Sequence, residues 1–152
     1  MKCIMYTIGK EDVSEFQDCL PKYVMKNCER EGIFILGAAD EEDNLIGLTQ
    51  FYLGMLSDES ILSEIIYVYV REDSRDKGVA SRMLGKIHQI LEKSGIEKSV
   101  VVLSEKDREK ILFKENGYMF MTLEENIKKS MGEMFGDRRY QTLLQGVCWI
   151  GR

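Results

Sequence analysis

The sequence predicts a mixed α/β fold in which one sheet is covered by helices. Two patterns predict it. In the first 60 residues, short apolar runs are separated by polar turns, as in antiparallel hairpins. After residue 62, runs typical of buried strands alternate with amphipathic helices, as in β-α-β crossovers. A chain of 152 residues with no linker or repeat is expected to form one domain over residues 1–152.

The first half contains a strand, a helical stretch and a hairpin. Residues 2–8 read as a strand, and residues 11–29 carry apolar side chains at near-helical spacing. Pro21 interrupts that stretch, so two short helices are expected. Residues 33–39 and 45–53 are apolar runs joined by an acidic turn, which predicts a hairpin.

The second half begins with the strongest strand signal, residues 62–70, whose near-continuous Ile, Tyr and Val content predicts burial on both faces. A helix with one apolar stripe is expected from about Gly78 to Lys93. A second helix is expected over residues 107–116, with Asp107 as its N-cap and Gly117 as its stop. Strands are expected at 99–103, 118–123 and 141–150, and a further helix at 124–135.

Composition excludes several classes of protein. The net charge of -5 disfavours nucleic-acid binding, which depends on Lys and Arg neutralising phosphates. No apolar run approaches the roughly 20 residues that span a bilayer, and the N-terminus lacks a signal peptide, so a cytoplasmic location without membrane contact is expected. The four cysteines form no C-x-x-C pair and there is one histidine, so free, mostly buried thiols and no metal site are expected.

The segment from Val68 to Ala80 carries the most chemistry. A strand ends there, a polar turn follows, and Gly78 opens a helix whose first N–H groups have no partner within the helix. The helix dipole adds partial positive charge, and Arg75 and Lys77 add whole charges, so an anion such as pyrophosphate fits. The alternative is an ordinary strand-to-helix turn with a solvated loop, and no Walker A or G-x-G-x-x-G motif occurs.

A resemblance to a known family favours the first interpretation. Residues Arg75 to Ala80 match the [RQ]-x-x-G-x-[GA] signature of the GNAT superfamily of acetyltransferases, and they follow a strand, as in that family. Residues Phe113 to Tyr118 resemble its Y-x-x-x-G-[FY] segment, and the resemblance extends over residues 1–123. It implies a mostly antiparallel central sheet with helices on both faces, and a splayed pair of parallel strands at 62–70 and 98–103.

The same resemblance implies that acetyl-CoA, as co-substrate, lies between the splayed strands. Backbone groups near Val68 and Val70 would bind the pantetheine arm, and backbone N–H groups from Arg75 to Ser81 would bind the pyrophosphate. The cofactor-binding positions implied are Val68, Val70, Arg75, Asp76, Lys77, Gly78, Val79, Ala80, Ser81, Asp107 and Phe113.

Transfer of an acyl group to an amine requires a base, because an ammonium group has no lone pair. Glu64 is the candidate base, because it is the one carboxylate on the central strand and burial would raise its pKa. The alternative is an exposed glutamate at the start of the strand. The family's usual acid is a tyrosine at the position that Phe113 occupies. Either Tyr67 or Tyr69 replaces it, or the thiolate leaves without an acid, or no amine is turned over.

The resulting hypothesis is an N-acyltransferase that moves an acetyl group from acetyl-CoA to a primary amine of a small molecule or peptide, by direct attack. The alternatives are an acyl-CoA-binding module without activity and a phosphate-binding domain with no preference for CoA. A homodimer is compatible with the resemblance. The amphipathic segment 124–139 would line the acceptor site or pack on a second subunit, and the sequence does not choose.

Overall fold

The computed structural model describes residues 2–55, 61–104, 106–122 and 143–151. The first half holds β1 (Ile4–Thr7), α1 (Lys10–Val13), a 3₁₀ helix η1 (Ser14–Cys19), α2 (Lys22–Asn27), β2 (Ile33–Ala39) and β3 (Leu45–Met55). The second half holds β4 (Ile61–Val70), a 3₁₀ turn η2 (Glu72–Ser74), α3 (Val79–Lys93), β5 (Lys98–Ser104), α4 (Lys110–Glu115), β6 (Met119–Thr122) and β7 (Leu143–Trp149).

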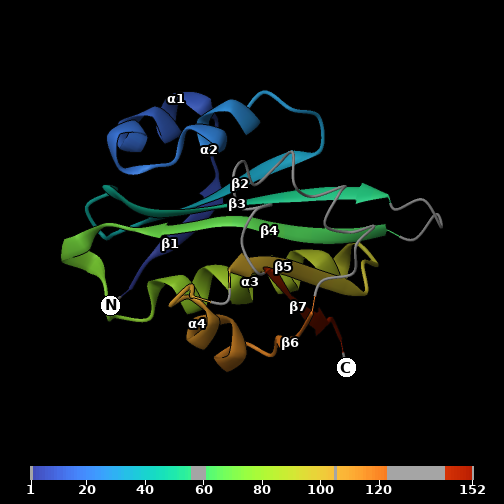
Figure 1. Ribbon diagram of the computed structural model, residues 1–152. Coiled ribbons are helices and arrows are strands. Elements are labelled where there is room, and N and C mark those ends of the chain that lie inside the picture. The colour runs from blue at the N-terminus through green and yellow to red at the C-terminus, as the bar shows by residue number, and fades with distance from the viewer. Residues whose placement is uncertain (1, 56–60, 105, 123–142, 152) are drawn as a thin grey trace.

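The described strands form one sheet in the order β1-β2-β3-β4-β5-β7-β6. Every pairing is antiparallel except β4 with β5, because α3 connects these two strands as a crossover. Helices α1 and α2 cover one face of the sheet, and α3 and α4 lie against the other (Figure 1). The expected mixed sheet, mostly antiparallel and with helices on both faces, is confirmed.

Two apolar clusters hold the layers together. On the α3 side, the buried stripe of α3 packs against β2 to β5; it consists of Val79, Met83, Leu84, Ile87 and Leu91. On the α1–α2 side, Val13, Phe16 and Val24 pack against Ile35 and Leu48 of the hairpin. Burial of each such side chain contributes about 1.5–3 kcal/mol, so both helical layers are fixed to the sheet by their apolar stripes.

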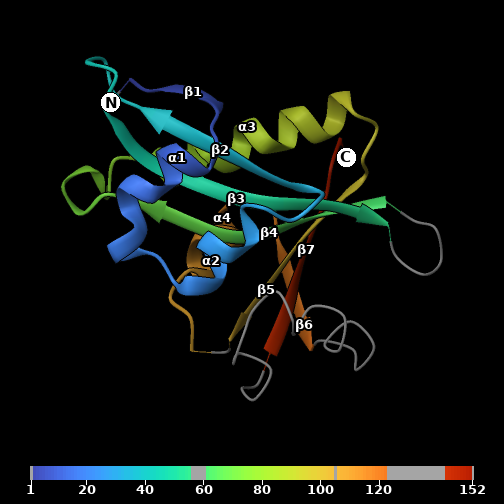
Figure 2. The ribbon, with the colours of Figure 1, turned by 90° about the horizontal axis from the view of Figure 1, so that it is seen from above.

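The centre of the sheet is irregular. Gln50 of β3 pairs with Tyr67 of β4 while the next residue, Phe51, pairs with Ile65, so Ile66 is an extra residue that forms a β-bulge. On the other edge of β4, the parallel pairing with β5 covers Ser63 to Ile65 and then ends. The two strands diverge toward their carboxyl ends (Figure 2). The splay of the parallel pair is therefore present. It was expected from the family resemblance and not from the strand patterns.

Most boundaries expected from the sequence agree with the structure. The strand at 33–39 is β2, and Pro21 separates two helical pieces, as expected. The helix expected from Asp107 begins instead at Lys110, and the expected helix at 124–135 lies outside the described residues. Of the four free cysteines only Cys148 is buried, so the expectation of mostly buried thiols is wrong. Among the described helices, none is long and apolar enough to cross a membrane.

Candidate active site

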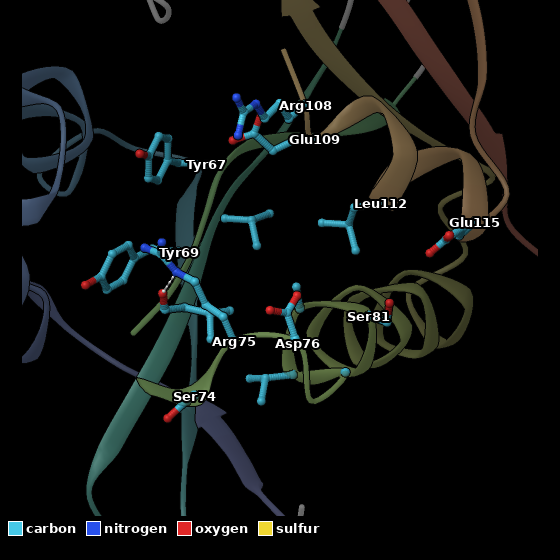
Figure 3. Close-up of a pocket in the computed structure, with 15 residues that line it drawn as sticks. Tyr67, Tyr69, Ser74, Arg75, Asp76, Ser81, Arg108, Glu109, Leu112 and Glu115 are labelled. Carbon is cyan, nitrogen blue, oxygen red and sulfur yellow. Dashed lines mark hydrogen bonds between the residues drawn. The ribbon is translucent and has the colours of Figure 1, made fainter. Parts of the chain in front are cut away.

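A pocket of about 700 Å³ opens between the carboxyl end of β4 and helix α4. The loop before α3 and the first turn of α3 close one end of it (Figure 3). Its lining consists of Tyr67, Val68, Tyr69, Val70, Ser74, Arg75, Asp76, Gly78, Val79, Ala80, Ser81, Arg108, Glu109, Leu112 and Glu115. Eight of the expected cofactor-binding positions are thus brought together: Val68, Val70, Arg75, Asp76, Gly78, Val79, Ala80 and Ser81.

Beyond Ile65, no described strand pairs with the β5-side edge of β4, where Val70 O accepts only the Arg75 side chain among the described contacts. The N–H of Arg71 bonds Ile46 O in β3, so the alternation of a strand directs the backbone groups of Val70 and Val68 to the opposite edge. On that edge the pairing of β4 with β5 has already ended at Ile65. An extended ligand could therefore add to this edge as a strand would.

The helix at the end of the pocket begins without a side-chain cap. Gly78 is its N-cap at φ +79°, with no side-chain cap, and the first bond of the helix runs from Arg82 N to Gly78 O. The N–H groups of Val79, Ala80 and Ser81 therefore precede the first bond, at the positive end of a 15-residue helix. Gly78 suits the left-handed conformation, and an added Cβ there would meet nothing within 4 Å. This start is suited to an anion.

The side chains of the loop divide between pocket and surface. Arg75 donates from Nε to Val70 O at 2.8 Å and lies over the Tyr69 ring, 5.9 Å from its centroid. Lys77 turns away and donates to Asp73 O at 3.2 Å, and it does not line the pocket. Arg75 is thus held against the strand while its guanidinium keeps further donors for a ligand.

The pocket is not positive overall. Its lining carries two arginines, Arg75 and Arg108, and three carboxylates, Asp76, Glu109 and Glu115. Affinity for an anion would therefore depend on the backbone N–H groups and the fixed guanidinium rather than on net charge. Asp76 also has a positive φ of 61°, which is uncommon for a residue other than glycine and adjoins the turn at Gly78.

Besides Lys77, two other expected cofactor-binding residues lie outside the pocket lining, Asp107 and Phe113. Asp107 is not the N-cap of α4, because its carboxylate accepts the Ser104 N–H at 2.8 Å and closes the turn after β5. Phe113 is 2% exposed, and its ring packs edge-on against Tyr118 in the core. It lines a separate cavity of about 30 Å³ between the diverging strands.

Glu64 lies deep in the sheet. It is 2% exposed, its Oε1 has no hydrogen-bond partner among the described residues, and burial raises its pKa to about 8. The alternative of an exposed glutamate at the strand start is wrong. Its neighbour Ile65 belongs to the α3-side cluster, so the Glu64 side chain faces the α1–α2 layer. It does not line the large pocket.

The two tyrosines considered as acids both line the pocket, in different settings (Figure 3). Tyr67 also lines the small cavity beside Phe113, and its ring packs edge-on against Tyr23 of α2. The pKa of Tyr69 is raised by a hydrogen bond with Cys19 and by burial. His88 lies away from this pocket, with Nε2 2.9 Å from Tyr118 Oη.

Sequence reasoning missed the wall that α4 supplies. Arg108, Glu109, Leu112 and Glu115 line the pocket, and none of them was among the expected cofactor-binding positions. Leu112 and Glu115 lie in α4, and Arg108 and Glu109 directly precede it; their spacing of three and four residues was the available signal for a shared face. The spacing alone does not say what that face meets.

A comparison with protein families finds one match. A family model described as the acetyltransferase (GNAT) family matches residues 4–118. No curated protein sequence matches the chain.

Solved structures share the fold at low identity. NAA60 of Arabidopsis thaliana, in complex with acetyl-CoA, is 15% identical with a TM-score of 0.69, covering 99% of this chain and 100% of that one. PaiA N-acetyltransferase of Thermoplasma acidophilum, in complex with coenzyme A, is 12% identical with a TM-score of 0.65, covering 98% and 99%. Mutant forms of the spermidine/spermine N-acetyltransferase SpeG of Vibrio cholerae are 14% identical with a TM-score of 0.69, covering 97% and 95%.

Proposed function

Because the chain belongs to the acetyltransferase (GNAT) family, we propose that it moves an acetyl group from acetyl-CoA to a primary amine by direct attack. One observation carries the proposal: the pocket joins the edge of β4 that no described strand pairs with beyond Ile65 to the start of α3, which has no side-chain cap. The first suits an extended amide-bearing arm and the second suits a pyrophosphate. An ordinary strand-to-helix turn would need neither an open strand edge nor a helix start without a side-chain cap.

In this proposal each part of the pocket binds one part of the donor. The backbone groups of Val68 and Val70 pair with the pantetheine arm. The N–H groups of Val79, Ala80 and Ser81 bind the pyrophosphate, and Arg75 adds charge-assisted donors. Phe113 and Asp107 hold α4 and the turn after β5 in place rather than contacting the donor.

Glu64 is the proposed base. The amine nitrogen attacks the thioester carbon, the C–N bond forms, and the C–S bond breaks. The amine's proton passes to the Glu64 carboxylate, through water, since Glu64 does not line the pocket. A pKa of about 8 makes this carboxylate a stronger base than an exposed glutamate, with a minority ionised at pH 7.

Tyr67 is the stronger candidate for the acid that protonates the leaving thiolate. It directly follows the bulge where β4 leaves β5, so it borders the place where the thioester would lie. Tyr69 is two residues, about 7 Å, further toward the pyrophosphate end. Its hydroxyl is bonded with Cys19.

A second function, an acyl-CoA-binding module without transfer, is favoured by two observations. Phe113 stands at the family's usual tyrosine position, and Glu64 is buried outside the pocket lining.

The acceptor is a small-molecule or peptide amine in the first proposal. A cytoplasmic location and a homodimer stay predictions.

The test is a calorimetric titration with acetyl-CoA, followed by thiol release with a panel of polyamines, amino sugars, amino acids and peptide N-termini. Saturable binding with amine-dependent release of CoA supports the transferase. Binding without release by any amine selects the binding module. If acetyl-CoA does not bind, both proposals are wrong.

A further inference from the structure

Asn116 joins the two helices that form opposite walls of the pocket. It lies at the carboxyl end of α4, and its side-chain nitrogen Nδ2 donates to Ser81 Oγ in the first turn of α3, at 3.1 Å. The same nitrogen donates to Leu112 O within α4, at 2.8 Å. Ser81 and Leu112 both line the pocket, while Asn116 does not.

The second bond fixes the orientation of the amide. A carbonyl oxygen only accepts hydrogen bonds, so the group facing Leu112 O must be the Asn116 NH₂ and not its oxygen. The other hydrogen of that NH₂ is then directed at Ser81 Oγ. Asn116 therefore acts as a donor to Ser81, and Ser81 acts as the acceptor.

This arrangement determines what Ser81 can do. A hydroxyl has one hydrogen to donate, and Ser81 cannot donate it to a nitrogen that is itself donating. Within the part of the chain that the structure describes, Ser81 Oγ donates to no other group. Its hydrogen is left for the pocket, beside the free N–H groups of the helix start.

We propose that Asn116 is a positioning residue that holds the Ser81 hydroxyl as a donor for the donor substrate's pyrophosphate. The inference rests on the proposed function and deepens it. A hydroxyl fixed as donor adds one charge-assisted bond to an anion. Because Asn116 is half-buried, water competes little for its bond with Ser81.

The test is a double-mutant cycle on Asn116→Ala and Ser81→Ala, with the affinity for CoA measured by calorimetry. Ser81→Ala is expected to weaken CoA binding by about tenfold and Asn116→Ala by roughly three- to tenfold. Because both act through one hydroxyl, the double variant should bind no more than about twofold worse than Ser81→Ala. The matched control Ser81→Thr keeps the hydroxyl and should retain most of the affinity.

Two readouts separate this role from a purely structural one. Melting temperatures without ligand report whether each variant folds. Pantetheine, which carries no phosphate, is titrated by ligand-observed NMR, and its affinity should be the same in wild type and Asn116→Ala. Unchanged CoA affinity in Asn116→Ala, single losses that multiply in the double variant, or a parallel loss of pantetheine affinity would each overturn the inference. If the wild-type protein binds no CoA, both the proposed function and this inference are wrong. If it binds CoA but the effects of the two substitutions are additive, only the inference is wrong.

Discussion

Arg75 reaches back to the strand it follows, donating from Nε to Val70 O at 2.8 Å. Replacement of Arg75 by Gln removes one positive charge and this anchor, and should weaken acetyl-CoA binding by roughly tenfold. Lys77→Gln removes the same charge from a side chain that is turned to Asp73 O. This variant should therefore lose much less affinity for acetyl-CoA. Calorimetry on both variants compares them; equal losses would mean that only the loop's net charge matters.

The glycines at the two ends of α3 form a matched pair. Gly78 and Gly95 have φ values of +79° and +74°, and an added Cβ meets nothing within 4 Å at either. Alanine at each should lower the free energy of unfolding by about 1 kcal/mol, through left-handed strain alone. Gly78 lines the pocket, so only Gly78→Ala should also weaken acetyl-CoA binding. Urea unfolding and calorimetry separate the two effects, and equal affinity in both variants would remove Gly78 from the site.

Glu64→Gln should change how stability depends on pH. Burial raises the pKa of Glu64 from 4.5 to about 8, so the folded state holds the proton more tightly. Wild-type stability is therefore full below pH 4.5 and falls as pH rises to 8, by up to about 1.4 kcal/mol per pH unit. The Gln variant lacks this loss, so its advantage should be greater at pH 8 than at pH 5. Urea unfolding at both values measures it, and a constant difference would place the Glu64 pKa outside this window.

Tyr67→Phe tests the proposed acid. It should lower kcat for acetyl-CoA by roughly tenfold to a hundredfold while leaving the affinity for acetyl-CoA unchanged. The loss should shrink with an acetyl thioester of a more acidic thiol, because that thiolate leaves without a proton. Tyr69→Phe serves as the control, and its kcat should change little. An equal loss with both thioesters would exclude proton donation by Tyr67.

The sequence predicts the parts of the site that are local and fails where the fold must bring parts together. Gly78 and the residues after it were predictable because the signature, the strand and the helix are contiguous. Asp107 has the residue type and spacing of an N-cap, yet its carboxylate closes the turn at Ser104 instead. A short polar side chain serves either turn, and local sequence does not decide which.

The α4 wall was missed for a related reason. Leu112 and Asn116 are four residues apart, so their shared face was visible, but its contact with Ser81 spans 35 residues. The burial of Phe113 was missed for a similar reason, because its ring packs against Tyr118, which lies beyond the end of α4. These contacts form only when one element packs on another, and no local sequence pattern predicts that packing.

The extra residue at Ile66 has a consequence for the phase of β4. In an unbroken strand, residues with odd and even numbers face opposite sides, so Glu64 and Tyr67 would point apart. The bulge resets this alternation: Ile65 and Val68 both face α3, and Glu64 and Tyr67 both face α1 and α2. Deletion of Ile66 would therefore remove the bulge and leave every later residue of the strand on its present face, whereas flattening the bulge with Ile66 retained would exchange the two faces for all of them. The proposed base and acid share one side of the sheet because the strand accommodates Ile66 as a bulge and not as a regular strand position.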